Sequence, residues 1–281
     1  MNLETKVYQK SNRFNIFTLG KQSIKDIISS HFLAQQLAKR DIKAQYRQSF
    51  LGILWALIIP LITAMVWVVL NSSGTVKMTD TGVPYPVYAF SGTLIWSIIT
   101  ESINSPIAST NGARGIISKI NFPKEALIIS GLYKLLFNST VKIGLLVVFV
   151  FIYGVGFHWS LLTFPLVVFG AMLVGTTIGL FLTPIGILYS DVSKLITITL
   201  QFLMYATPVV YAIPEGGFMK TLMEWNPLTP IVITTRDVVL GTSPTFLTYF
   251  LIVVAVSIPF FILGMLLYRV SIPVIVERLS A

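Results

Sequence analysis

Four polar residues near the N-terminus are spaced so that they could bind an anion together. They follow one another at intervals of four, three and four residues: Gln36, Arg40, Lys43 and Arg47. In a helix these intervals place the side chains on one face, so the sequence predicts a basic face. An arginine fork binds phosphate with two hydrogen bonds, and lysine supplies a mobile charge. The basic face could contact anionic lipid headgroups, a partner protein or the phosphates of a substrate, or it could serve only as a membrane anchor.

The opposite face of the same segment is apolar. Few helix breakers occur between residues 31 and 50, and apolar residues recur at every fourth position: Ala34, Ala38, Ile42, Tyr46 and Phe50. A helix with one apolar and one basic face lies in the plane of a membrane surface. We therefore expect an amphipathic interfacial helix in this segment.

The chain offers no convergent set of catalytic groups. Its two histidines, His31 and His158, are expected at opposite membrane faces and so cannot share a site. The sequence has no cysteine, which excludes disulfides and thiolate metal sites within the chain. It also has no glycine-rich phosphate loop that ends in Lys and then Ser or Thr. We expect no catalytic residue, metal or cofactor in this chain, so any coupling to ATP must come from a partner.

Three ionisable residues interrupt the apolar runs of the sequence: Glu101, Lys134 and Lys142. Charged groups inside a membrane are costly to bury and are therefore functional candidates. Glu101 and Lys134 are expected within a few turns of the membrane boundary, where a structural pair or a snorkelling side chain is an equally good interpretation. Lys142 is expected deeper, either lining a hydrated conduit or pairing with Glu101.

Composition indicates that lipid is the solvent of most of the chain. Of the 281 residues 54% are apolar and only 11% are charged, against about a quarter charged in soluble domains. The net charge of +9 does not indicate nucleic-acid binding, because nine of the twenty Lys and Arg residues precede the first apolar run without forming a basic tract. The N-terminal segment also lacks the apolar core of a signal peptide, so we expect no cleavage.

The apolar runs predict six transmembrane helices, because about 20 helical residues cross a bilayer. They cover residues 50–70, 86–107, 126–153, 161–189, 195–213 and 246–268. We therefore expect an all-α integral membrane protein in three parts. These are a cytoplasmic N-terminal segment (1–49) with the amphipathic helix, a permease-like membrane domain (50–268) and a cytoplasmic tail (269–281).

The distribution of basic residues predicts the orientation of these spans. Fifteen Lys and Arg residues lie before the first span, after the last one, or in the loops after spans two and four. The other side of the predicted membrane has only three: Lys77, Lys220 and Arg236. Because basic loops stay in the cytoplasm, both termini should be cytoplasmic.

The connection before the last span is unusual. Residues 225–235 are uncharged, too short to span a membrane and interrupted by Pro227 and Pro230. A re-entrant or interfacial pair of short helices on the outer face fits this pattern best, and an ordinary loop is the alternative.

Five segments in a fixed order resemble one family of transport proteins. They include RDIKAQYRQSFLGILWALIIPL and TPVVYAIP, and they cover residues 40–61, 84–96, 117–129, 207–214 and 226–241. The chain is similar to the permeases of ATP-binding-cassette polysaccharide exporters, and above all to O-antigen export permeases. Teichoic-acid and capsular polysaccharide permeases remain alternatives within this class. An ion-coupled transporter is a distant alternative because the halves show no internal repeat, and a membrane enzyme is less favoured still.

The resemblance implies partners and a location. It implies a homodimer in the cytoplasmic (inner) membrane, joined to two copies of a separate ATPase subunit that holds ATP and Mg²⁺, with a lipid-linked polysaccharide as substrate. It also implies a short cytoplasmic helix at about residues 109–122 that contacts the ATPase. The residues that it offers for this contact are Asn111, Arg114, Lys119 and Phe122.

The resemblance further implies a channel between the two permeases and a gate at its outer end. Candidate channel residues are Tyr205 and Tyr211, whose aromatic faces suit sliding sugars, and Lys142, the deeper ionisable residue that could face a hydrated conduit. The re-entrant segment would be the outer gate, with candidate residues Trp225, Asn226, Pro227 and Pro230. Arg40, Lys43 and Arg47 would then contact the phosphates of the lipid-linked substrate.

Overall fold

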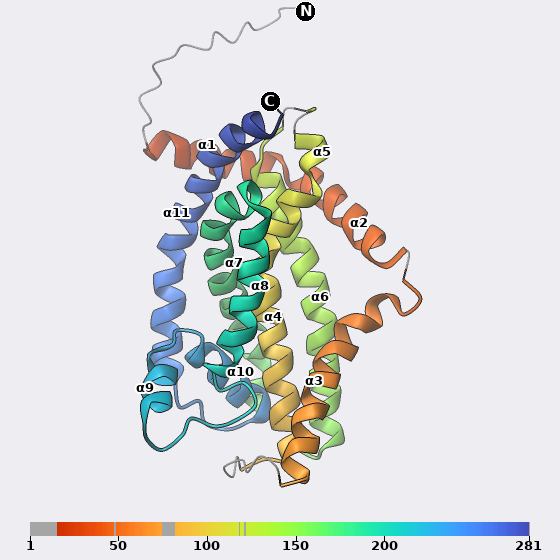
Figure 1. Cartoon of the computed structure of the whole chain (residues 1–281), viewed down its shortest axis with the longest axis vertical. Coiled ribbons are helices and arrows are strands. Elements are labelled where there is room, and N and C mark those ends of the chain that lie inside the picture. The colour runs from red at the N-terminus through yellow and green to blue at the C-terminus, as the bar shows by residue number, and fades with distance from the viewer. Residues whose placement is uncertain (1–15, 48, 75–81, 118, 121, 281) are drawn as a thin grey trace, which may run out of the picture.

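The computed structural model describes residues 16–47, 49–74, 82–117, 119–120 and 122–280, and this part of the chain has helices and no strand. Most helices run along one long axis (Figure 1). Helix α1 (Ile16–Ser29) and the last turns of α11 (Leu247–Ser280) lie at one end, here named the terminal end. The short helix α9 (Phe218–Trp225) lies at the opposite end, here named the α9 end.

Within the described residues, four segments are long and apolar enough to cross a bilayer by length and composition. They are Gly52–Ser72, Glu125–Ile152, Phe164–Leu188 and Leu247–Ile275. They contain helices α3 (Trp55–Ser72), α6 (Glu125–Ile152), α7 (Phe164–Leu188) and most of α11, and they coincide with the first, third, fourth and sixth predicted spans. The chain is therefore a multi-pass membrane protein.

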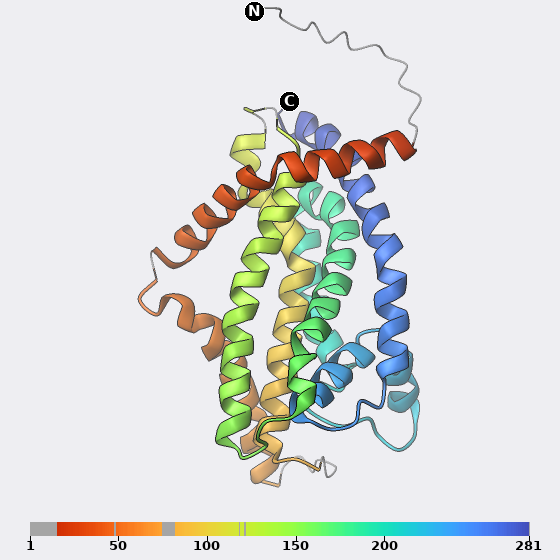
Figure 2. The same ribbon diagram turned by 180° about the vertical axis from the view of Figure 1, so that it is seen from behind.

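The second predicted span is also helical, whereas the fifth (195–213) is helical only as far as Tyr205, because residues 206–213 form turns and irregular chain, and neither span meets the same criterion. Helix α4 (Tyr85–Gly112) is 28 residues long and carries many polar side chains, whereas α8 (Ser190–Tyr205) has only 16 residues. Both run alongside the other long helices in two opposite views (Figures 1 and 2). The six-span topology therefore stays a prediction.

Helix α4 lies at the centre of the bundle and packs against α3, α6 and α7. Glycines on α7 allow the closest of these contacts. A Cβ atom added to Gly175 would lie 2.6 Å from the Ser102 Cβ, and one added to Gly179 would lie 2.2 Å from the Ile103 carbonyl oxygen. Small residues one turn apart are the usual means of close packing between membrane helices. The main apolar core accordingly surrounds α4, with Phe90, Leu94 and Phe164 fully buried in it.

The predicted amphipathic helix is α2 (His31–Arg47), which follows α1 at the terminal end, packs beside α6 and slopes outward toward the start of α3 (Figure 2). Ala34, Leu37 and Ala38 are buried on its inner face. The helix ends at Arg47, so its expected continuation to Phe50 is wrong: a short 3-10 turn, η1 (Gly52–Leu54), leads into α3 instead, and Phe50 is fully exposed. The side chain of Tyr46 and the whole of Lys77 lie outside the described residues.

The unusual connection before α11 forms a pair of short helices, as the sequence predicts. Helix α9 is followed by a turn at Asn226 and Pro227, and then by α10 (Thr229–Leu240), whose first turn contains Pro230. Most of α10 is buried against α4, α7 and α11. The other short elements are α5 (Arg114–Ile117) and η2 (Trp159–Leu162). The re-entrant placement of α10 in a membrane stays a prediction.

Candidate functional site

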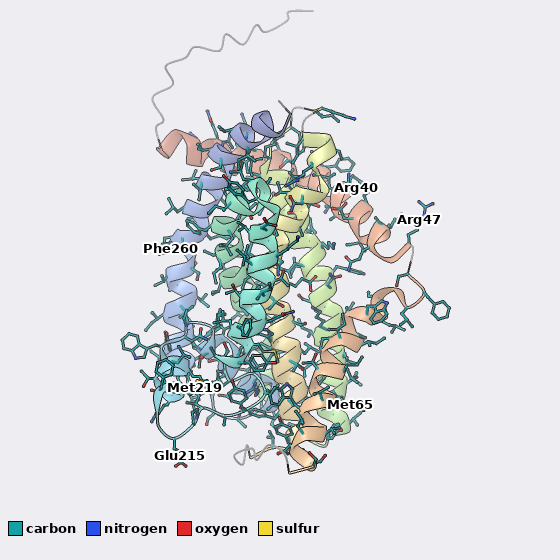
Figure 3. The ribbon with its side chains drawn as sticks, viewed as in Figure 1. Arg40, Arg47, Met65, Glu215, Met219 and Phe260 are labelled. Carbon is teal, nitrogen blue, oxygen red and sulfur yellow. The ribbon has the colours of Figure 1, made fainter. Side chains whose placement is uncertain are left out.

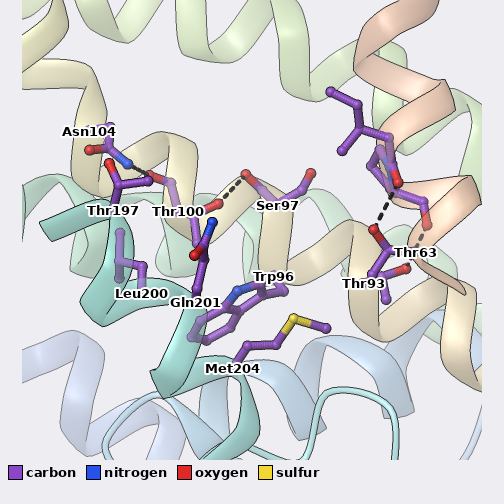
Figure 4. A pocket seen from close by; sticks show the side chains of 12 residues that line it. Thr63, Thr93, Trp96, Ser97, Thr100, Asn104, Thr197, Leu200, Gln201 and Met204 are labelled. Atoms are coloured by element: carbon purple, nitrogen blue, oxygen red, sulfur yellow. Dashed lines mark hydrogen bonds between the residues drawn. The ribbon is translucent and has the colours of Figure 1, made fainter. Parts of the chain in front are cut away.

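A groove with a cavity of about 300 Å³ lies between α3, α4 and α8 (Figure 4). None of its lining residues is charged. Apolar and aromatic residues form part of the wall: Ile59, Pro60, Trp96, Leu200 and Met204. The remaining lining residues carry hydroxyl or amide groups: Thr63, Thr93, Ser97, Thr100, Asn104, Thr197 and Gln201. The groove therefore combines neutral hydrogen-bonding groups with apolar surface.

The polar side of the groove comes mainly from one face of α4. Its four polar residues are spaced four, three and four positions apart, which places them in a single row along a helix: Thr93, Ser97, Thr100 and Asn104. The sequence analysis missed this row, although its spacing matches that of the basic residues on α2. The same row explains why α4 is less apolar than the four segments that meet the criterion for crossing a bilayer.

Hydrogen bonds fix several of these side chains in place. The Thr100 hydroxyl donates to the Ser97 carbonyl oxygen at 3.1 Å, and the Asn104 amide donates to the Thr100 carbonyl oxygen at 2.8 Å. The Thr93 hydroxyl lies 3.2 Å from the Pro60 carbonyl oxygen and so joins α4 to α3. The Ser97 hydroxyl is buried and has no hydrogen-bond partner among the described residues. These side chains are thus held in place, and the Ser97 hydroxyl remains available to bind a polar ligand.

Three aromatic residues lie at the α9 end of the groove. Trp67 is one helical turn beyond Thr63 on α3, and Tyr205 is one turn beyond Gln201 on α8. The Trp67 ring centroid lies 6.4 Å from those of Tyr205 and Tyr211, and the Tyr211 hydroxyl donates to the Tyr205 carbonyl oxygen. The structure thus brings the predicted channel residues Tyr205 and Tyr211 together, and it adds Trp67 to them.

The third predicted channel residue, Lys142, does not line the groove. It lies on α6, where its Nζ is 2.7 Å from Oε2 of Glu101, and Asn138 donates to the other carboxylate oxygen of Glu101. The Lys142 side chain is 7% exposed and that of Glu101 is 26% exposed. Pairing with Glu101, the alternative from the sequence, is therefore what the structure shows for this residue.

The open side of Glu101 faces a second, smaller cavity of about 110 Å³ between α2, α4 and α6. Asp41 and Lys134 also line it. Carboxylates and an ammonium group therefore meet beneath the amphipathic helix, close to the terminal end.

The basic face of α2 is exposed along its whole length. Arg40, Lys43 and Arg47 are all accessible, and Figure 3 shows Arg47 well away from the other helices. Arg40 pairs with its neighbour Asp41 at 2.7 Å. Exposed ion pairs contribute little free energy, so this pair does not prevent Arg40 from binding a phosphate.

The predicted ATPase-contact segment contains the four-residue helix α5, much shorter than the expected range of 109–122. Arg114 Nη2 donates to the Ile187 carbonyl oxygen at 2.5 Å, which joins α5 to the last turn of α7. Lys119 is exposed, whereas Asn111 and Phe122 are partly buried. Lys124 stacks on the Phe122 ring at 4.3 Å from its centroid, and partial burial lowers the pKa of this lysine.

The predicted outer-gate residues differ in their surroundings. Trp225 is 80% exposed and Pro227 is exposed, whereas Asn226 and Pro230 are buried. The Asn226 amide donates to the Ala206 carbonyl oxygen at 3.0 Å. Only part of this set therefore faces the surroundings of the chain, and Asn226 instead joins the α9–α10 turn to the end of α8.

An ion-pair cluster that the sequence analysis did not predict connects three helices at the terminal end. Arg269 on α11 contacts Asp26 on α1 at 2.7 Å and also binds Glu125 on α6. Ser23 on α1 donates to the same Glu125 carboxylate at 3.2 Å. These contacts fix α1 across the end of the bundle.

Comparison with known proteins identifies one transporter family and several similar export permeases. The sequence profile of the family described as ABC-2 type transporter matches residues 33–240. The O-antigen export system permease protein RfbA of Myxococcus xanthus is 26% identical over 212 residues, which cover 74% of this chain and 80% of that protein. Two proteins of the same name from Klebsiella pneumoniae are 24% and 22% identical, each over 72% of this chain and 77% of their own length.

Proposed function

The chain belongs to the ABC-2 type transporter family, and from this we propose that it is the permease subunit of an exporter that moves lipid-linked polysaccharide, specifically O-antigen, across the cytoplasmic membrane. In this proposal the chain crosses the membrane six times, with both termini in the cytoplasm. The terminal end is then the cytoplasmic end, and the α9 end is the outer end.

The groove between α3, α4 and α8 is the observation that carries this proposal. Thr93, Thr100 and Asn104 of the row donate to backbone carbonyl groups, but the Ser97 hydroxyl would have no hydrogen-bond partner if it faced lipid, which is costly. A polar, uncharged ligand removes this cost. A polysaccharide supplies hydroxyl groups for the row on α4 and apolar C–H faces for Trp96 and its apolar neighbours.

The energy for transport comes, in this proposal, from two copies of a separate ATPase bound to a dimer of this chain. The segment around α5 is the proposed contact, because it lies at the terminal end and Arg114 joins it to the end of α7. A rigid link of this kind can transmit a movement of the ATPase into the bundle. The exposed basic face of α2 meets the phosphates of the lipid carrier at the headgroup level.

The uncharged lining of the groove also favours transport driven by ATP hydrolysis over transport coupled to an ion gradient. Ion-coupled transporters place ionisable groups at the substrate site. Here the membrane-embedded pair of Glu101 and Lys142 neutralises itself and lies outside the groove.

Site-specific photo-cross-linking in cells tests the proposed function. A photoreactive residue in place of Gln201, in the groove, should form covalent adducts with the polymer, seen as glycan-bearing bands of higher mass. The same residue in place of Leu263, an exposed apolar residue of α11, is the matched control and should capture lipid but no glycan. Absence of glycan at position 201, or equal capture at both positions, would contradict the assignment.

A further inference from the structure

Arg236 on α10 is a buried cation with an unusual environment. It is 2% exposed and forms no ion pair with any acidic residue in the described part of the chain. Its neighbour Asp237 lies instead beside Thr242 and the Thr245 backbone amide, each at 3.3 Å. Burial of a charge without a directly bound counter-ion is costly, so the contacts of this guanidinium must offset part of the lost hydration.

Two kinds of contact surround the guanidinium. Its Nη2 donates to the Pro208 carbonyl oxygen at 3.0 Å and to that of Val209. Its central carbon lies 3.8 Å from the centroid of the Tyr88 ring on α4. A planar cation on an aromatic face gains cation–π energy, and one Nη group carries two hydrogens that can serve two acceptors at once. Arg236 therefore joins α10, α4 and the turn that follows α8.

Other side chains hold the same turn, residues 206–211. Asn226 donates to the Ala206 carbonyl oxygen at 3.0 Å, and the Tyr85 hydroxyl donates to that of Val210 at 3.0 Å. Together with Arg236, these residues bind the carbonyl groups of four of the first five turn residues. The turn is thus fixed by side chains from α4, α10 and the α9–α10 connection, in the absence of regular secondary structure.

Gly92 on α4 shows how closely these parts fit together. A Cβ atom added there would lie 1.8 Å from the Val209 carbonyl oxygen and 2.3 Å from Arg236 Nη2. Either the carbonyl group or the guanidinium would have to move. Only glycine therefore permits this contact at position 92.

The fixed turn carries Tyr211 and begins directly after Tyr205, and both rings lie beside Trp67 at the outer end of the groove. We propose that Arg236 is a positioning residue that holds this aromatic cluster against α3 and so keeps the outer end of the groove closed. The inference rests on the proposed function in taking the groove as the transport path and the α9 end as the outer end. The experiment below probes the groove with a small thiol reagent, so its outcome does not depend on polysaccharide binding.

Thiol labelling from outside the cell tests this inference, because the chain has no cysteine of its own. Ser97→Cys places a single thiol in the groove at a hydroxyl that is buried and has no hydrogen-bond partner. In the parent chain a membrane-impermeant maleimide should label it slowly. Arg236→Lys keeps the charge but loses the planar fork, and it should raise the labelling rate roughly tenfold, as expected for the loss of a hydrogen bond to a charged group.

Gly92→Ala is the second test variant, since it disturbs the same contact from α4 and should give the same increase. Two controls should leave the labelling rate unchanged. Thr235→Val alters an equally buried neighbour whose hydroxyl donates within its own helix, and Gly144→Ala adds a methyl group that meets no neighbour within 4 Å.

A separate Ser73→Cys reporter, exposed at the outer end, should label in every background and so verifies membrane insertion. Slow labelling of Ser97→Cys in both test variants would overturn the inference. Equally fast labelling in Thr235→Val would also overturn it, because a general loosening would then explain the effect. A failure of glycan cross-linking would leave these outcomes unaffected, so the two proposals can fail separately.

Discussion

The Glu101–Lys142 ion pair joins α4 and α6, and its contribution to the free energy of unfolding can be predicted. Replacing Lys142 by Met removes the cation and leaves the Glu101 carboxylate inside the bundle with Asn138 as its remaining polar partner. The loss of one partner from a fully buried pair costs roughly 3–5 kcal/mol. Because the Glu101 side chain is 26% exposed, towards the 110 Å³ cavity, we expect a smaller cost here, roughly 2–4 kcal/mol.

The double variant Lys142→Met and Glu101→Leu should behave differently. It replaces the pair with apolar side chains of similar size, and such replacements are typically neutral or stabilising. For a chain of this size, a cost of roughly 2–4 kcal/mol corresponds to a fall in Tm of roughly 4–8 °C. We expect this fall for the single variant and a nearly parental Tm for the double variant.

Thermal unfolding in detergent, followed by tryptophan fluorescence, measures both variants, and polymer export in cells should follow the same order. A Tm of the single variant within 1 °C of the parent, a difference of roughly 0.5 kcal/mol or less, would refute the reasoning. Loss of export in a double variant of parental Tm would show that the Glu101–Lys142 pair takes part in transport itself, in line with the sequence interpretation of Lys142 as a conduit residue.

Three further predictions concern the surface and the topology of the chain. Arg40→Gln with Arg47→Gln should impair export while expression and ATPase co-purification stay normal, because two phosphate forks are lost; normal export would leave α2 as an anchor only. Arg114→Met removes the bond to the Ile187 carbonyl group, so ATP hydrolysis by the complex should continue while export falls; export at the parental rate would contradict the proposed link. Reporters fused after Ser73, Lys119 and Gly217 should report outside, inside and outside locations, respectively. A cytoplasmic signal from the fusion after Gly217 would exclude six spans.

The sequence predicted the location of the long helices better than it predicted which groups each side chain contacts. Apolar runs located the long helices because the thickness of the bilayer fixes the length of a crossing helix. The count of basic residues placed Arg236 on the outer side of the membrane, because such a count treats every basic residue as solvated. In the structure Arg236 lies in a buried helix, and its partners are backbone carbonyl groups that no sequence pattern marks.

The residues of the candidate site were likewise predicted only in part. Tyr205 and Tyr211 were predicted from their aromatic faces, and they do meet at the groove, whereas Trp67 joins them because α3 brings its ring beside theirs. The row of Thr93, Ser97, Thr100 and Asn104 was readable from its spacing. Neutral hydroxyl and amide groups can donate within their own helix and so do not by themselves mark a binding site, whereas a charge inside an apolar run does.

The location of the polymer in cells that lack this chain tests the central claim most directly. Pulse-labelled polymer in the deletion strain should collect on the cytoplasmic face of the inner membrane, joined to its lipid carrier and hidden from external antibody. Expression of the intact chain should return the polymer to the cell surface, whereas a strain that also lacks the ATPase should stay blocked. Polymer that reaches the surface at the normal rate without this chain would contradict the account.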